Sequence, residues 1–135
     1  MEDFVSYKIA RKLKGKGFRD KTFAYYPSSG ILQWRRAYIY DTPITDVMKC
    51  SNKENTTIDA PTISQVLKWL REEKKIFIDV ATFADHRAGG YFWGCEVYDI
   101  SQMPKYVYYK SYILNKSNYN EAAIAGIEYC LDNLI

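Results

Sequence analysis

Three consecutive strands are predicted by the stretch from Ile76 to Leu114, which reads IFIDVATFADHRAGGYFWGCEVYDISQMPKYVYYKSYIL. Apolar residues recur at every second position in three parts of it, and this alternation is typical of a sheet with one buried face. The predicted strands are Ile76–Ala84, Tyr91–Ile100 and Tyr106–Leu114. Because the links between them are short, we expect an antiparallel meander whose Val80, Trp93 and Val97 face the helices.

Helices are expected before and after this meander. Ser6 is an N-cap residue for a helix over residues 7–16, and Gly17 can take the left-handed conformation that ends it. Thr62 opens a Thr-Ile-Ser-Gln capping box before a helix over residues 63–74. Asn118 caps a last helix that begins at Tyr119. Residues 22–26 and 31–40 alternate as strands, and the turn residues between them predict a β-hairpin.

The order of these elements predicts the α+β class, as one domain over residues 1–135. We expect a two-layer sandwich, in which the hairpin and the meander form the antiparallel sheet and the helices pack on one face. Residues 41–60 show no regular pattern and include a long polar run. A connection of this length is either functional or mobile, and we favour a mobile loop.

Charge is unevenly distributed along the chain, although the formal net charge is only +3. Residues 1–50 hold ten Lys and Arg against five Asp and Glu, whereas residues 76–135 hold four against seven. A basic N-terminal part attracts nucleic acid or an acidic partner, unless it is simply a solvated helix face.

The three cysteines show no C-x-x-C spacing, which argues against a disulfide framework and against a zinc site. Cys95 and Cys130 fall on apolar faces and are expected to be buried, reduced thiols in a cytoplasmic protein. Cys50 lies in the irregular segment, where a reactive thiol would need a lowered pKa and a nearby base. The N-terminus does not read as a signal peptide, and no apolar run has membrane-spanning length, so no membrane partner is expected.

Few residues suggest chemistry. His86 is the only histidine, and a polar hairpin loop is favoured over catalysis because no nucleophile or second acid accompanies it. Gly89-Gly90 lacks the strand–loop–helix context of a phosphate-binding loop. Asp79 and Glu96 fall on one sheet face, where solvated charges paired with Lys110 are favoured over a glycosidase-like acid pair. No catalytic residue, cofactor or metal ligand is therefore predicted.

Basic residues gather in the first helix and the hairpin, where Trp34 and Tyr38 add aromatic rings. Charge for phosphates and rings for stacking are together typical of nucleic-acid binding. A solvated face with ordinary core aromatics is the alternative. The candidate nucleic-acid contacts are Lys8, Arg11, Lys12, Lys14, Arg35 and Arg36.

The outer face of the meander is too aromatic to be wholly solvated. Tyrosines there can be half covered and keep their hydroxyls in water, which interfaces favour. We expect this face to contact another chain, most simply a second copy across a two-fold axis, unless the hairpin covers it. The candidate interface residues are Tyr98, Tyr106, Tyr108 and Tyr112.

Residues 62–135 resemble the double-stranded-RNA-binding domain in their order of one helix, three strands and one helix. Such domains contact RNA phosphates through lysines at the start of the last helix. This chain has Ser117-Asn118-Tyr119-Asn120-Glu121 at that place. The resemblance therefore implies the topology, but not RNA binding at that helix.

Short motifs over most of the chain resemble small uncharacterised proteins of phages and prophages in gut Bacteroidetes. They are Val5-Ser6-Tyr7, Ala10-Arg11-Lys12-Leu13, Gly17-Phe18, Ala60-Pro61-Thr62, Trp69-Leu70-Arg71-Glu72 and the helix from Tyr119 to Ile135. The resemblance implies an accessory protein in the cytoplasm of a bacterial host, and it brings no catalytic residues. We expect a non-enzymatic protein-interaction module with a protein partner or a homodimer, and nucleic-acid binding is the alternative.

Overall fold

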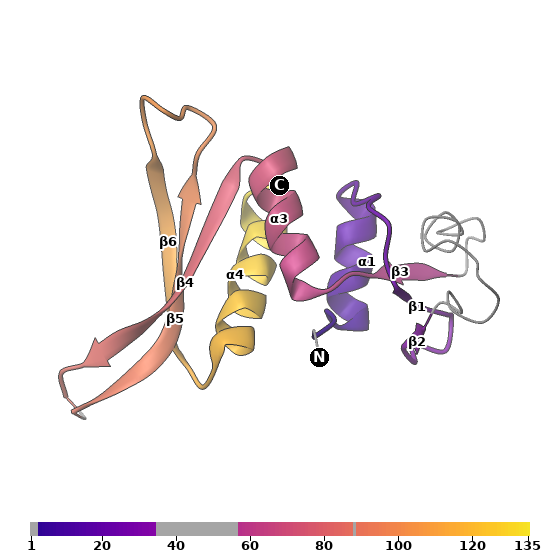
Figure 1. Ribbon diagram of the computed structural model, residues 1–135, viewed down its shortest axis with the longest axis horizontal. Coiled ribbons are helices and arrows are strands. Elements are labelled where there is room, and N and C mark those ends of the chain that lie inside the picture. The colour runs from indigo at the N-terminus through magenta and orange to yellow at the C-terminus, as the bar shows by residue number, and fades with distance from the viewer. Residues whose placement is uncertain (1–2, 35–56, 88) are drawn as a thin grey trace, which may run out of the picture. The chain divides into compact units, whose positions relative to one another are not determined.

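The computed structural model describes residues 3–34, 57–87 and 89–135. The chain divides into two compact units, Met1–Thr62 and Ile63–Ile135. In chain order the helices and strands are α1 (Tyr7–Gly15), β1 (Ala24–Tyr26), β2 (Gln33–Trp34), β3 (Ile58–Ala60), α3 (Ile63–Glu73), β4 (Ile76–Asp85), β5 (Gly90–Asp99), β6 (Tyr108–Lys116) and α4 (Tyr119–Asn133) (Figure 1). The predicted α+β class is confirmed, with two small antiparallel sheets.

In the first unit, α1 begins and ends where its sequence predicts. The Ser6 side chain accepts a hydrogen bond from the Ile9 backbone N–H at 3.3 Å, which is an N-cap. Gly17 has a φ of +95°, and the Phe18 N–H donates to the Leu13 carbonyl at 3.0 Å. This geometry closes the helix end and brings the buried Phe18 ring back towards the last turn.

The sheet of the first unit has the order β2-β1-β3, with both pairs antiparallel. Tyr26 anchors it, because its hydroxyl donates to the Val5 carbonyl at 2.7 Å. The Val5 N–H in turn donates to the Pro61 carbonyl at 3.0 Å, just after β3. The segment before α1 is thereby tied to the ends of β1 and β3.

The hairpin was expected to form one sheet with the meander, and the structure shows two separate sheets. The predicted second strand includes residues 35–40, and these lie outside the described residues, as do residues 41–56 of the loop expected over residues 41–60. The end of that loop forms β3, which pairs with β1. The hairpin therefore belongs to a three-stranded sheet of its own and does not extend the meander. Three residues are too few to show a period, so no local pattern predicts this strand.

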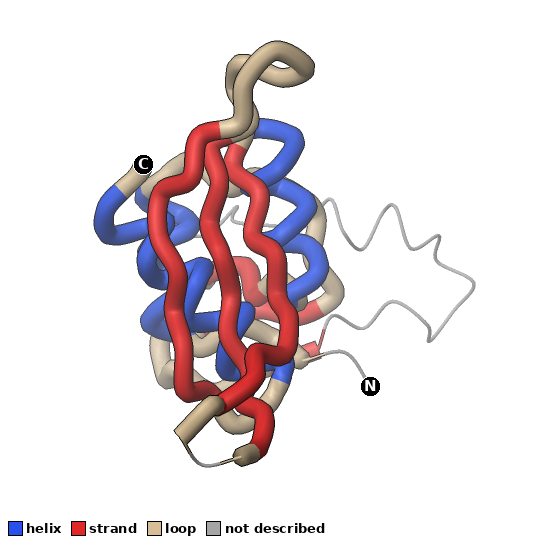
Figure 2. The backbone as a smooth tube through the Cα atoms, turned by 90° about the vertical axis from the view of Figure 1, so that its left-hand side faces the viewer, coloured by secondary structure: helices blue, strands red, loops and turns tan. Residues whose placement is uncertain are grey.

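In the second unit, the meander is confirmed with the order β4-β5-β6. Figure 2 shows its three strands in front, with α3 and α4 behind them, so both helices lie on one face. The helix–strand–strand–strand–helix order predicted for residues 62–135 is also confirmed. Buried side chains on the inner faces of these elements form the core; they include Val66, Leu70, Ile78, Cys95, Val97, Ile127, Cys130 and Leu131.

Close packing fixes α4 against the strands. A Cβ atom added at Gly126 would lie 2.9 Å from both Cys95 Sγ and Ile78 Cγ2, so this glycine is where the helix touches the sheet. Near the start of the helix, the Tyr119 ring packs edge-on against Trp93, with ring centroids 5.9 Å apart. These contacts place Trp93 and Cys95 on the helix-facing side, as the alternation predicts.

Candidate interaction surfaces

On the face of the meander opposite α3 and α4, side chains that are paired across the three strands form rows. Residues paired across neighbouring strands share a face. Phe77 pairs with Tyr98 and Tyr98 with Tyr109, which makes one aromatic row across the three strands. The next row joins Asp79, Glu96 and Tyr112. We call these six residues the tyrosine patch: Phe77, Asp79, Glu96, Tyr98, Tyr109 and Tyr112.

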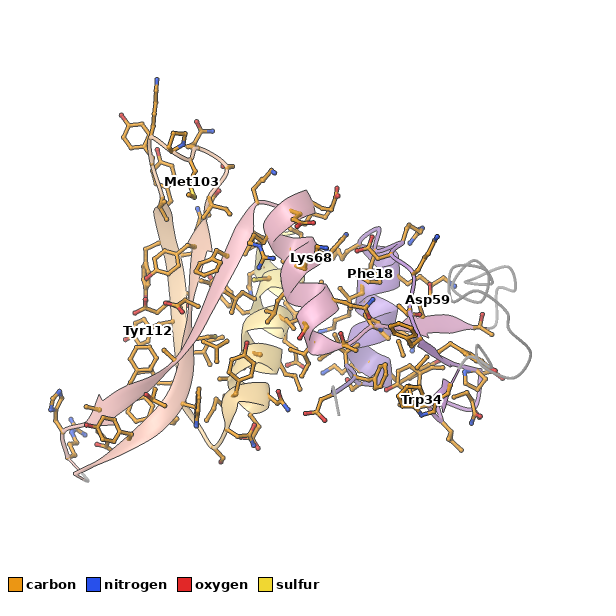
Figure 3. The ribbon with its side chains drawn as sticks, viewed as in Figure 1. Phe18, Trp34, Asp59, Lys68, Met103 and Tyr112 are labelled. Carbon is orange, nitrogen blue, oxygen red and sulfur yellow. The ribbon has the colours of Figure 1, made fainter. Side chains whose placement is uncertain are left out.

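The rings of the patch contact one another and remain accessible. The Tyr98 and Tyr109 centroids are 5.7 Å apart in an edge-to-face arrangement, and those of Tyr109 and Tyr112 are 6.4 Å apart and stacked. Tyr109 is 50% exposed and Tyr112 is 59% exposed. Figure 3 shows Tyr112 on the side of the sheet that faces away from α3 and α4. Neither of these two helices covers the patch.

A β-bulge decides which tyrosines come together. Val97 pairs with Ser111, but the next residue along β5, Tyr98, pairs with Tyr109, so Lys110 is the extra residue on β6. Simple alternation places Tyr108 beside Tyr112, and this placement is wrong because the bulge shifts the phase by one residue. Tyr109 takes that position instead, and no residue type at the bulge marks it in the sequence.

The four predicted interface tyrosines therefore fall into two groups. Tyr98 and Tyr112 belong to the patch. Tyr106 precedes β6, and its ring stacks on that of Tyr108 with centroids 6.0 Å apart. Both of these are exposed, but Tyr108 pairs with Asp99, on the opposite face of the sheet from Tyr98.

Two carboxylates shape the electrostatics of the patch. The Tyr98 hydroxyl donates a hydrogen bond to Glu96, and this bond raises the pKa of Tyr98 to about 12. Asp79 stands directly opposite Glu96, as their shared face predicts. The predicted pairing of Lys110 with these two acids is not what the structure shows. The pKa of Asp99 is lowered mainly by its hydrogen bonds to Ser101, and the positive charge of Lys110 lowers it further.

Basic side chains line one side of α1 in the first unit. Tyr7, Lys8, Arg11 and Lys12 border a shallow depression of about 380 Å³. The Arg11 guanidinium lies over the Tyr7 ring, 5.8 Å from its centroid. The predicted nucleic-acid contacts Lys8, Arg11 and Lys12 are thus brought together.

The other predicted contacts are not part of this group. Lys14 Nζ donates to the Thr57 carbonyl at 3.3 Å, so this ammonium is engaged by the backbone next to β3. Arg35 and Arg36 lie outside the described residues, as does Tyr38. Trp34 is exposed, and its ring packs edge-on against Phe4, with centroids 5.0 Å apart.

The remaining candidates are the single histidine and the cysteines. His86 is exposed in the turn between β4 and β5. Cys95 and Cys130 are confirmed as buried free thiols, whereas Cys50 lies outside the described residues. Within the described ranges, no three His, Cys, Asp or Glu side chains are placed to hold a metal ion. No helix in that part of the chain is long and apolar enough to cross a bilayer.

Comparisons with protein-family models, with curated proteins and with solved structures found no match for the chain. The two surfaces are therefore interpreted from their own geometry and charge. The tyrosine patch is an aromatic and acidic surface on a three-stranded sheet, and the side of α1 is a basic one.

Proposed function

We propose that the protein is a non-enzymatic protein-interaction module of the phage or prophage accessory type, and that it binds its partner through the tyrosine patch. One observation carries the proposal: Tyr109 and Tyr112 are at least half exposed on a sheet face that neither α3 nor α4 covers. Tyrosine rings gain hydrophobic free energy when a partner covers them, and their hydroxyls remain able to form hydrogen bonds.

The scaffold beneath the patch also supports binding of a protein. The three strands are paired over most of their length and are braced from behind by α4 at Gly126. A surface on paired strands loses little conformational entropy when a partner docks. The motif resemblance described above is the support for the assignment to phage and prophage accessory proteins.

The test compares the protein with a Tyr109→Glu/Tyr112→Glu variant and with Tyr91→Glu as the matched control. Tyr91 is an exposed tyrosine of the same sheet, and its pairing with Ala84 places it outside the patch. Each immobilised protein is used to capture partners from a bacterial lysate, with quantitative mass spectrometry, and each is also sedimented alone.

We expect a partner, or self-association, that persists in the Tyr91→Glu protein and is lost in the double variant, while circular dichroism remains unchanged. Identical capture profiles and identical sedimentation for all three proteins would contradict the proposal.

Nucleic-acid binding is the second candidate, and the clustering of Lys8, Arg11 and Lys12 around one depression favours it. Basic side chains along one helix face neutralise phosphates and release counterions. We expect a labelled DNA duplex to be retained at low salt and released as the salt concentration rises. No retention at low salt would end this candidate.

A further inference from the structure

The charge of the tyrosine patch has one sign only. Asp79 and Glu96 are direct neighbours across β4 and β5, and like charges in this position destabilise a sheet. No described residue forms an ion pair with either carboxylate. The three strands contain two lysines. The charge of Lys110, at the bulge, helps to lower the pKa of Asp99. Lys116 is paired with Trp93, on the helix-facing side of the sheet. Within the part of the chain that the structure describes, this pair of acids therefore has no ion-pair partner, and the Tyr98 hydroxyl donates the hydrogen bond that Glu96 accepts.

The rings around these acids suit a cation. Tyr112 is in the same row as Asp79 and Glu96, and Phe77, Tyr98 and Tyr109 form the adjacent row. An arginine guanidinium can stack on an aromatic face while it donates two hydrogen bonds to a carboxylate. A lysine ammonium is more strongly hydrated and cannot form the paired bonds, so arginine fits this combination better.

We propose that the tyrosine patch recognises an arginine-bearing segment of a partner protein, with the guanidinium placed against Asp79 and Glu96 and beside the tyrosine rings. This inference rests on the proposed function and specifies the chemistry of the partner. A two-fold contact between two copies of the same patch is disfavoured, because it would bring four carboxylates together. Nucleic acid is disfavoured here as well, since the acids repel phosphates.

The experiment measures binding of a labelled peptide of alternating threonine and arginine by fluorescence anisotropy at low and at physiological ionic strength. A second peptide carries citrulline in place of arginine, which keeps the shape and removes the charge. The test variant is Asp79→Asn/Glu96→Gln, in which position 96 can still accept the Tyr98 hydrogen bond. The matched control is Glu72→Gln/Glu73→Gln, which removes two exposed acids from α3.

We expect the arginine peptide to bind the unmodified protein and the α3 control equally, and to bind the Asp79→Asn/Glu96→Gln variant about tenfold more weakly or worse. The citrulline peptide should bind the unmodified protein about tenfold more weakly than the arginine peptide does, or worse. Since the variant removes a like-charge pair, its unfolding midpoint should equal or exceed that of the unmodified protein, which separates recognition from a structural role.

Equal binding by the Asp79→Asn/Glu96→Gln variant, or no binding of the arginine peptide even at low ionic strength, would overturn the inference. Binding of a lysine peptide with the same affinity would overturn the preference for arginine. A partner captured by the unmodified protein and lost with Tyr109→Glu/Tyr112→Glu, but kept by Asp79→Asn/Glu96→Gln, would leave the proposed function in place and remove this inference alone.

Discussion

Within the tyrosine patch, the ionisation of Tyr98 depends on a neighbouring carboxylate. Hydrogen bonding to Glu96 is the largest cause of its raised pKa, followed by burial and by the negative charges of Glu96 and Asp79. A neutral hydroxyl donates this bond and a tyrosinate cannot, so the protein holds Tyr98 in its protonated form. The charge of Glu96 also reaches the neighbouring strand, because burial and then this charge raise the pKa of Tyr109.

Glu96→Gln should therefore lower the pKa of Tyr98 from about 12 towards its ordinary value of 10.0. The measurement is a ¹³C NMR titration of ring-labelled tyrosine, with Tyr98→Phe to assign the signal. The pKa of Tyr98 is higher in the folded protein than in the unfolded chain. Its contribution to the free energy of unfolding is therefore complete below pH 10 and is lost as the pH rises through 12. The unmodified protein should thus lose stability more steeply than Tyr98→Phe across this window, and parallel curves would contradict the assignment.

Burial opposes the ionisation of the two core thiols, Cys95 and Cys130. It raises the pKa of Cys95 to about 11 and that of Cys130 to about 12, from an ordinary value of 9.0. The thiolate is the reactive form, so both thiols should resist alkylation in the folded protein.

A Cys50→Ser variant leaves only these two cysteines, and we expect iodoacetamide to modify neither at about pH 8 until denaturant is added. Mass spectrometry counts the modified thiols. The raised pKa values also mean that the thiols favour the folded state below pH 9, and that this contribution is lost as the pH rises through 11 and 12. Rapid labelling without denaturant would show that the helix–sheet packing opens readily.

Among the secondary-structure elements, α4 depends on the absence of a side chain at Gly126. Alanine favours a helix over glycine by about 1 kcal/mol, but a Cβ here would lie 2.9 Å from Ile78 Cγ2, on a stiff branched side chain. Overpacking a core typically costs about 1–3 kcal/mol, which exceeds the helical gain.

Gly126→Ala should accordingly lower the free energy of unfolding, whereas Gly15→Ala should raise it by about 0.4–1 kcal/mol. Gly15 ends α1, has no positive φ, and a Cβ there would meet no atom within 4 Å. Denaturant titration of both variants, with the slope compared to the unmodified protein, measures the two shifts. A stabilised Gly126→Ala protein would show that α4 does not pack on Ile78 and Cys95.

Sequence periodicity predicts the longer elements and fails at shorter features. The strands β4, β5 and β6 and the helices α3 and α4 begin and end within two residues of their predicted bounds. The predicted face is also right for Asp79, Glu96, Tyr98 and Tyr112. Tyr109 is missed because the bulge at Lys110 depends on pairing with β5, which local alternation does not encode. β3 is missed because a three-residue strand is defined only by its distant partner β1.

Considered as a whole, the molecule carries surfaces of opposite charge. Lys8, Arg11 and Lys12 give α1 a basic side, and Asp79 and Glu96 make the tyrosine patch acidic. These surfaces select different partners: phosphates are attracted to the first and repelled by the second. A change on one surface should therefore leave the function of the other intact, and this independence separates the two candidate functions experimentally.

The last prediction uses this separation to test nucleic-acid binding. Replacing Lys8, Arg11 and Lys12 together by glutamine should weaken binding of a labelled DNA duplex. It should also flatten the slope of log K against log salt concentration by about 0.9 for each phosphate that the variant no longer neutralises. Lys105→Gln/Lys110→Gln is the control, since it removes two exposed lysines from the other unit. Asp79→Asn/Glu96→Gln should not weaken duplex binding, because it removes charges that repel phosphate. Fluorescence anisotropy over a salt series measures the slopes, and equal slopes for the triple variant and the control would show that α1 does not contact the duplex.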